Sequence, residues 1–304
     1  MDNLCHTLVG GALAESGLRR RTRYATAALV LGANFPDLDI AFAFTEHGLG
    51  MRRGVTHGVL ALVVLPFALT GLILLWHRWR GRTRPGKPDV MPRQLLLLAA
   101  LAILTHPTLD WMNVYGMRWL MPFDGTWFYG DSLFILDPWL WLPLGGAWFV
   151  GRRCRRRDAA RKGERFARAL VVAGGLYIAA MMTLSGVGRS IAARELGLSS
   201  PGPRQLMVAP PPLASWRRRV TFDAGTGYRF GTLEWRGRLL LELDPDELPK
   251  RLELLDSIPR TAPLGDLLDW ARFPFARKTA DSVHVDDARY GRGGRSFAGV
   301  TLKR

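Results

Sequence analysis

The segment that most constrains this chain is a charge-free apolar run that ends in a histidine and an aspartate. It runs from Leu95 to Thr105 and continues as His106-Pro107-Thr-Leu-Asp110. Positions i and i+4 of a helix share a face, so the imidazole and the carboxylate can converge on one ion or water molecule. Such groups are costly in a membrane-type segment unless they are paired, bound to metal or facing water. Pro107 leaves open whether the helix ends at His106 and restarts at the proline.

The charge distribution indicates a membrane protein. Lys and Arg number 42 against 26 Asp and Glu, a formal net charge of +16. The basic residues gather in short loops between apolar runs, chiefly Arg19–Arg23, Arg78–Arg93 and Arg152–Arg165. This is the positive-inside pattern, which argues against a direct nucleic-acid partner and places these loops in the cytoplasm. Membrane lipids are the partners we expect, because anionic headgroups suit the same loops.

The apolar runs predict a mainly α integral membrane region over residues 1–189. We expect about five to six membrane-embedded helices, some short or broken. The runs are Leu4–Ser16, Ala25–Phe44 (interrupted by Asn34-Phe-Pro-Asp37-Leu-Asp39), Val59–Trp76, Leu95–Trp111, Trp139–Val150 and Phe166–Val187.

The character of the sequence changes after Arg189. Prolines over residues 190–212 predict a stiff linker. Residues 213–304 predict a small soluble α+β domain with an antiparallel sheet, because Arg219–Leu243 alternates polar and apolar residues around glycine turns. A short helix over Leu264–Phe273 and further strands over Ser282–Tyr290 and Phe297–Leu302 complete the prediction.

The topology that follows from the basic loops gathers the ionisable residues at one face. With those loops in the cytoplasm, the tail after Arg189 is extracytoplasmic. Arg52 and Arg53 then lie on the outer side and depart from the charge rule. The His and Asp residues that interrupt apolar sequence all fall at non-cytoplasmic ends: His6, Asp37, Asp39, His57, His106, Asp110, Asp131 and Asp137.

Three histidines with several aspartates are typical ligands of a first-row divalent metal ion. Zinc is our first expectation and manganese the alternative. Cys5 and Cys154 are far apart and offer no disulfide framework or thiolate site. A metal with an open position lowers the pKa of water for hydrolysis, and a carboxylate can act as general base, with Asp39 and Asp110 as candidates. Asp131 and Asp137 would be outer or additional ligands.

Each of these residues also has a structural interpretation. Asp37 and Asp39 could form a turn after a proline, and Asp131 and Asp137 could be helix N-caps. His106 and Asp110 could be a hydrogen-bonded pair. The alternative function is therefore a non-catalytic membrane protein with a structural His/Asp cluster, whose tail or basic loops bind a partner.

Several motifs resemble the YdjM-like family of predicted membrane-bound, metal-dependent hydrolases, also described as LexA-binding and inner-membrane-associated. The resemblance covers residues 1 to about 187. It rests on Met1-Asp-Asn-Leu-Cys-His6, Asn34-Phe-Pro-Asp37-Leu-Asp39, Arg53-Gly-Val-Thr-His57, Leu104-Thr-His106-Pro-Thr-Leu-Asp110 and Asp131-Ser-Leu-Phe-Ile-Leu-Asp137.

The resemblance implies the bacterial inner membrane and a hydrolase with a metal cofactor. The His-x-x-x-Asp element is also similar to zinc-dependent phospholipase C enzymes, an analogy that suggests a phosphoester or lipid-linked substrate. A LexA-type partner is implied by the family alone. It fits poorly with a site that faces away from the cytoplasm, because such a partner could reach only the basic loops.

Overall fold

The computed structural model describes residues 1–42, 45, 47–80, 89–291 and 299–303. The chain forms two compact units. The helical unit comprises residues 1–38 and 53–182, and the sheet unit comprises residues 39–52 and 183–304. The end of the predicted Ala25–Phe44 run, the central part of the Arg78–Arg93 hairpin and the start of the Phe297–Leu302 strand lie outside the described residues.

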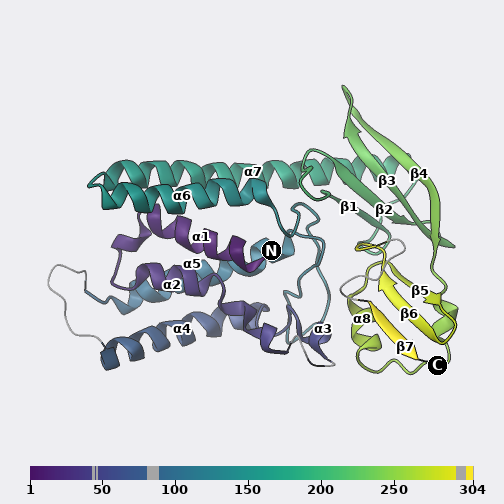
Figure 1. Cartoon of the computed structure of the whole chain (residues 1–304), viewed down its shortest axis with the longest axis horizontal. Helices are drawn as coiled ribbons and strands as arrows, with labels where there is room; N and C mark the ends of the chain where they lie inside the picture. Colours follow the sequence, from purple (N-terminus) through teal and green to yellow (C-terminus); the bar gives the residue numbers. More distant parts are fainter. Residues whose placement is uncertain (43–44, 46, 81–88, 292–298, 304) are drawn as a thin grey trace. The chain divides into compact units, whose positions relative to one another are not determined.

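Among its described residues, the helical unit contains six α-helices, whose axes run side by side (Figure 1). Length and apolar composition make three of its helices, α4, α5 and α7, candidate membrane spans. The helical membrane region is therefore confirmed, whereas the expected count of five to six embedded helices is not. The elements are α1 (Asn3–Glu15), the 3₁₀-helix η1 (Leu18–Arg20), α2 (Ala25–Gly32), α4 (Val59–Arg80), α5 (Pro92–Trp111), α6 (Pro138–Arg156) and the first part of α7 (Ala160–Glu195).

Helix α1 lies between two apolar clusters. Asp2 is its N-cap, because the Asp2 carboxylate accepts a 3.0 Å hydrogen bond from the backbone N–H of Cys5. Leu8 and Ala12 pack with buried residues of α6 and α7, and Ala14 packs with buried residues of α2, α4 and α5. At Gly10 a Cβ atom would lie 2.5 Å from the Leu29 carbonyl oxygen, so glycine permits the close approach of α1 to α2.

Helix α5 is continuous through Pro107, so the break that the sequence left open does not occur. Membrane helices tolerate an internal proline when nearby hydroxyls and neighbouring helices satisfy the backbone. The hydroxyls of Thr105 and Thr108 donate to the carbonyls of Ala102 and Leu104, at 2.6 and 2.7 Å. The carbonyl that Pro107 deprives of its i+4 donor is that of Ile103, which lies in the buried cluster shared with α2 and α4. The predicted break after Asn34 does occur, because α2 ends at Gly32 and the 3₁₀-helix η2 (Phe35–Phe42) follows.

The sheet unit holds two antiparallel sheets, where we expected one. The predicted meander is confirmed as part of the first sheet, in the order β1-β2-β3-β4, and the second has the order β5-β6-β7. The strands are β1 (Leu206–Ala209), β2 (Arg218–Asp223), β3 (Gly227–Trp235), β4 (Leu239–Pro249), β5 (Pro274–Lys278), β6 (Ser282–Asp287) and β7 (Val300–Lys303). Helices α3 (Gly48–Met51) and α8 (Leu264–Trp270) and the 3₁₀-helix η3 (Leu252–Leu255) complete the unit.

Residues 190–212, which we assigned to a linker, contain regular structure. They include the end of α7 and strand β1, which pairs with β2. Ala192 of α7 packs in one cluster with Leu206, Val220 and Leu233 of the first sheet. The prolines of this segment lie on either side of β1.

Candidate metal centre

Five of the predicted ligands converge inside the helical unit. His6 lies on α1, Asp37 on η2, His57 just before α4, and His106 and Asp110 on the last turns of α5. All five are buried, with exposed fractions from 0 to 7%. Four chain segments therefore deliver imidazole and carboxylate groups to one interior position, as the sequence predicts.

The distances between the ligand atoms fit a small metal ion. The Nε2 atoms of His57 and His106 are 3.1 Å apart. Oδ1 of Asp37 lies 3.8 Å from the former and 3.7 Å from the latter, and Oδ2 of Asp110 lies at 3.6 and 3.7 Å. Tetrahedral zinc with ligands at about 2.0–2.1 Å has ligand-to-ligand edges of about 3.3–3.4 Å. These five distances therefore lie within about half an ångström of such edges, and His57, His106 and Asp110 together are able to hold a metal ion.

Neighbouring oxygens orient two of the imidazoles. Nδ1 of His106 lies 2.7 Å from the carbonyl oxygen of Ala33, and Nδ1 of His57 lies 2.9 Å from the hydroxyl of Thr56. A carbonyl can only accept, so Nδ1 of His106 donates and its Nε2 presents a lone pair to the cluster. Burial, together with the adjacent His106 ring, lowers the pKa of His57 well below its ordinary value, which favours the neutral form that binds metal.

His6 is the least satisfied polar group of the cluster. Its ring stacks on that of His106 with centroids 3.7 Å apart. Within the described residues, neither ring nitrogen makes a hydrogen bond, although Nε2 lies 3.4 Å from Oδ1 of Asp110. Buried polar nitrogens without partners are costly and call for an explanation. A metal ion would provide one, and His6, Asp37 and His106 together are able to hold it.

Asn3 fixes the carboxylate of Asp37 by donating its side-chain amide to Oδ2 at 3.0 Å. Burial alone would raise the pKa of Asp37, but its interaction with His106 holds that pKa below the ordinary value. Asp37 is therefore an ionised carboxylate in a buried site, as a metal ligand must be.

Arg53 is a residue of this centre that the sequence analysis did not assign to it. Its guanidinium is 3% exposed and makes two contacts with Asp110, Nε to Oδ2 at 2.8 Å and Nη2 to Oδ1 at 3.0 Å. Nη1 donates to Oδ1 of Asn113 and to the carbonyl of Gly116, and the group stacks on Tyr115. The amino group of Met1 also contacts Asp110. The available signal in the sequence was the departure of Arg53 from the positive-inside rule.

The other predicted residues have separate contacts. Asp39 is buried in the sheet unit, where its Oδ1 accepts from Arg52 at 2.7 Å. Asp137 is the N-cap of α6 and accepts from the backbone N–H of Trp139 and the hydroxyl of Tyr177. Asp131 is buried at a position with a positive φ of 50°. Among the described residues, the groups able to hold a metal do not include these three.

Residues 1–187 match the family of the YdjM inner membrane protein, which covers more than half of the chain. This chain belongs to the YdjM family. The match spans all five clustered His and Asp residues, and the resemblance inferred from their motifs is confirmed. Family membership and the apolar helices together support a location in the membrane.

A second comparison connects this YdjM family member with a curated protein of Bacillus subtilis (strain 168), the uncharacterized protein YfhP. The two are 23% identical over 167 residues, which are 50% of this chain and 47% of YfhP. The chain thus spans about half the length of the curated relative it matches. No solved structure matches the chain.

Proposed function

We propose that this YdjM family member is a membrane-bound, metal-dependent hydrolase. The supporting observation is the buried convergence of His6, Asp37, His57, His106 and Asp110, in which both nitrogens of His6 lack a hydrogen bond within the described residues. Zinc is the metal that this ligand set suits best, with manganese as the alternative. The charge rule places the centre at the non-cytoplasmic face of a bacterial inner membrane, with the sheet unit on the same side.

A divalent metal would supply Lewis-acid polarisation and would lower the pKa of a water molecule toward neutrality. The chain itself holds the ligands in place, through Ala33 and Thr56 at the imidazoles and Asn3 and Arg53 at the carboxylates. Asp39 and Asp110, the two predicted general bases, each pair with an arginine. Because a guanidinium already engages each carboxylate, we infer that both aspartates hold positive charge in place rather than abstract a proton.

A phosphoester or lipid-linked substrate suits this position. His106 and Asp110 lie near the end of a candidate membrane span, and His57 directly precedes another. A lipid-borne ester could approach such a centre laterally, whereas its burial excludes bulk water.

Metal analysis is the first test. We expect full-length protein purified in detergent to carry stoichiometric zinc or manganese, and His106→Ala to lose at least about tenfold in metal occupancy. His47→Ala is the matched control, because the His47 side chain is 69% exposed and lies in the sheet unit. Equal metal content in all three proteins would reject the ligand assignment.

Turnover is the second test. The metal-loaded protein is assayed for phosphate release from p-nitrophenyl phosphate and from phosphatidic acid in mixed micelles, beside Asp110→Asn. We expect release by the wild type and at least about 10²-fold slower release by the variant, the usual scale for loss of one key electrostatic contact. Bound metal without release from either substrate would contradict hydrolysis of these phosphoesters.

One observation favours a non-catalytic alternative. Arg53 engages both oxygens of Asp110 within a buried hydrogen-bonded network. A structural polar cluster would look the same there, with the tail or the basic loops binding a partner. This alternative predicts protein without metal whose fold still depends on Asp110.

A further inference from the structure

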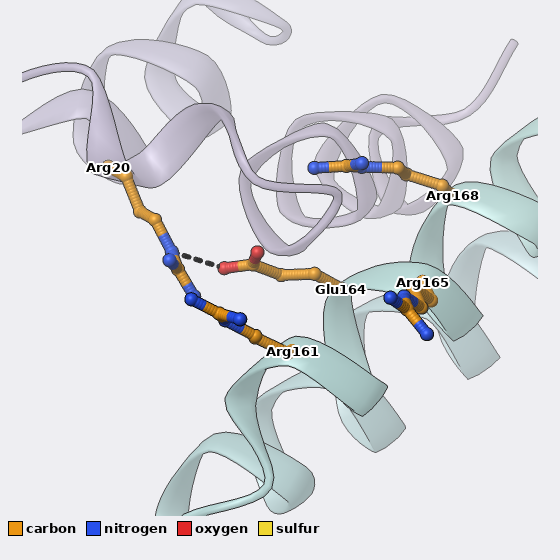
Figure 2. A pocket seen from close by; sticks show the side chains of 5 residues that line it. All are labelled: Arg20, Arg161, Glu164, Arg165 and Arg168. Atoms are coloured by element: carbon orange, nitrogen blue, oxygen red, sulfur yellow. Dashed lines mark ion pairs between the residues drawn. The ribbon is translucent and has the colours of Figure 1, made fainter.

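A basic pocket lies beyond the end of α1 opposite to His6. Its volume is about 200 Å³, and it lies wholly within the helical unit. Its lining combines four guanidinium groups with one carboxylate, as Figure 2 shows. The lining residues are Arg20, Arg161, Glu164, Arg165 and Arg168.

The wall of the pocket is built by a tight turn and an ion-pair cluster. Gly17 has a φ of +118°, and a Cβ atom there would lie 3.0 Å from Nη2 of Arg168. Arg168 donates from Nε to the carbonyl of Ser16 at 2.7 Å. Glu164 pairs with Arg20 and accepts from Arg19 at 3.0 Å. The single carboxylate is thus already occupied by the η1 side of the pocket.

The α7 side of the pocket is left with unneutralised positive charge. Within the part of the chain that the structure describes, no ion pair is formed by Arg161, Arg165 or Arg168. All three are exposed. Concentrated like charge repels itself, and a planar guanidinium matches phosphate oxygens in two-pronged hydrogen bonds. Arg161 and Arg165 also stand in the first turns of the 36-residue helix α7, where the helix dipole favours an anion.

The pocket lies at the boundary of an apolar segment, which is where a lipid headgroup would lie. α7 is a candidate membrane span, and its exposed apolar side chains begin with Phe166, directly after Arg165, and continue with Val172 and Leu176. Basic side chains at such a boundary attract anionic headgroups. The volume is below the roughly 300–1,000 Å³ of pockets for larger ligands, so it suits one phosphate-bearing group.

We propose that this pocket binds a phosphate group, carried either by an anionic phospholipid headgroup or by a soluble phosphate. Arg161, Arg165 and Arg168 contact the phosphate oxygens, and Glu164 holds Arg20 at the rim. This site is separate from the His/Asp cluster and does not depend on hydrolysis.

The test compares a pocket variant, Arg161→Gln/Arg165→Gln, with a control of equal charge change, Arg153→Gln/Arg156→Gln, at exposed positions on α6. One arm measures the affinity of full-length protein for phosphatidylglycerol in phosphatidylcholine nanodiscs, and the other measures inorganic phosphate in phosphatidylcholine nanodiscs alone. We expect at least roughly tenfold weaker binding by the pocket variant in one arm, because each charge-assisted hydrogen bond contributes about that factor. The arm that responds identifies the source of the phosphate.

We expect a second variant to bind phosphate more tightly than the wild type, not more weakly. Glu164→Gln removes the carboxylate but keeps an oxygen that can accept from Arg19, so we expect tighter binding in the responding arm. The proposal is overturned if the pocket variant binds like the control in both arms, or if Glu164→Gln does not tighten binding. Unchanged metal content and melting temperature in the pocket variant verify that the fold and the His/Asp cluster are intact.

Discussion

At the scale of single residues, the charge balance of the His/Asp cluster depends on Arg53. This guanidinium is surrounded by Asp110, the amide oxygen of Asn113, the Gly116 carbonyl and the Tyr115 ring. A buried ion pair of this kind is expensive to assemble because both charges lose their hydration. Its value to the protein therefore lies in what it fixes, which is the position of Asp110 beside His57 and His106.

Replacing Arg53 should lower the thermal stability of the protein. Arg53→Gln leaves Asp110 without its guanidinium partner, and removal of one member of a buried pair costs about 3–5 kcal/mol. We expect a lower midpoint of thermal unfolding for the detergent-purified protein. Arg153→Gln is the control, because Arg153 is exposed on α6 in the same helical unit. A midpoint for Arg53→Gln equal to that of the control would mean that the pair does not stabilise the fold.

At the scale of elements, the turn that links α1 to η1 determines which ion pairs form at the basic end of the helical unit. The chain leaves α1 at Ser16, turns through Gly17 with a positive φ, and places Arg19 and Arg20 against Glu164 of α7. Glu15 adds ion pairs to Arg19 and to Arg155 of α6. Three helices are thereby joined by charge at the end remote from His6.

Gly17→Ala tests whether the turn between α1 and η1 requires glycine. A left-handed backbone costs a non-glycine residue of order 1–3 kcal/mol, and the added methyl would meet Arg168. We expect lower thermal stability. Gly175→Ala, within α7 and with nothing within 4 Å of the added Cβ, should be neutral or slightly stabilising. Equal effects of the two substitutions would show that the turn does not require glycine.

The sequence predicted some elements better than others. The break after α2 and the strands of the meander were predictable, because proline and alternation act locally. The course of α5 through Pro107 was not, because a proline inside a helix is tolerated only where the tertiary surroundings compensate for it. Strands β6 and β7 of the second sheet were predicted as strands, whereas β5 and the pairing of these three strands as a separate sheet were not. The three strands are short, and β6 and β7 are separated by many residues in the sequence. Tertiary contacts therefore decide which strands pair.

The candidate site was predictable for a related reason. The predicted topology put the ends of the apolar runs that carry His6, Asp37, His57 and His106 on the same side of the membrane. The structure brings these residues together. The same argument could not separate Asp39 from Asp37, since residues two apart share any topology. The local course of η2 decides which of them reaches the cluster, because it brings Asp37 to His57 and Asp39 to Arg52.

At the scale of the whole molecule, charge and fold together predict an orientation. The basic ends of α4, α6 and η1 and the start of α7 carry the arginines, and the His/Asp cluster lies at the other ends of α1 and α5. From the positive-inside rule we predict that the arginines face the cytoplasm and that the sheet unit lies outside it.

Reporter fusions test this orientation. Alkaline phosphatase, which is active only outside the cytoplasm, should be active when fused after residue 304 and inactive when fused after residue 158 in the α6–α7 loop. Green fluorescent protein fused at the same two positions should give the reverse. Activity of the phosphatase at residue 158 would invert the orientation and would place the His/Asp cluster at the cytoplasmic face, where a cytoplasmic partner could reach it.

The shortness of α1 sets the depth of the His/Asp cluster. Its 13 residues measure about 20 Å along the axis, whereas the hydrocarbon core of a bilayer is about 30 Å thick. Nine residues, or about 14 Å of helix, separate His6 from Glu15, so a basic pocket at one headgroup layer would leave His6 roughly 15 Å short of the opposite layer. The ester bonds of a phospholipid sit just beneath its own headgroup, so a lipid-borne ester would have to sink below the level of its own headgroup layer to meet the cluster.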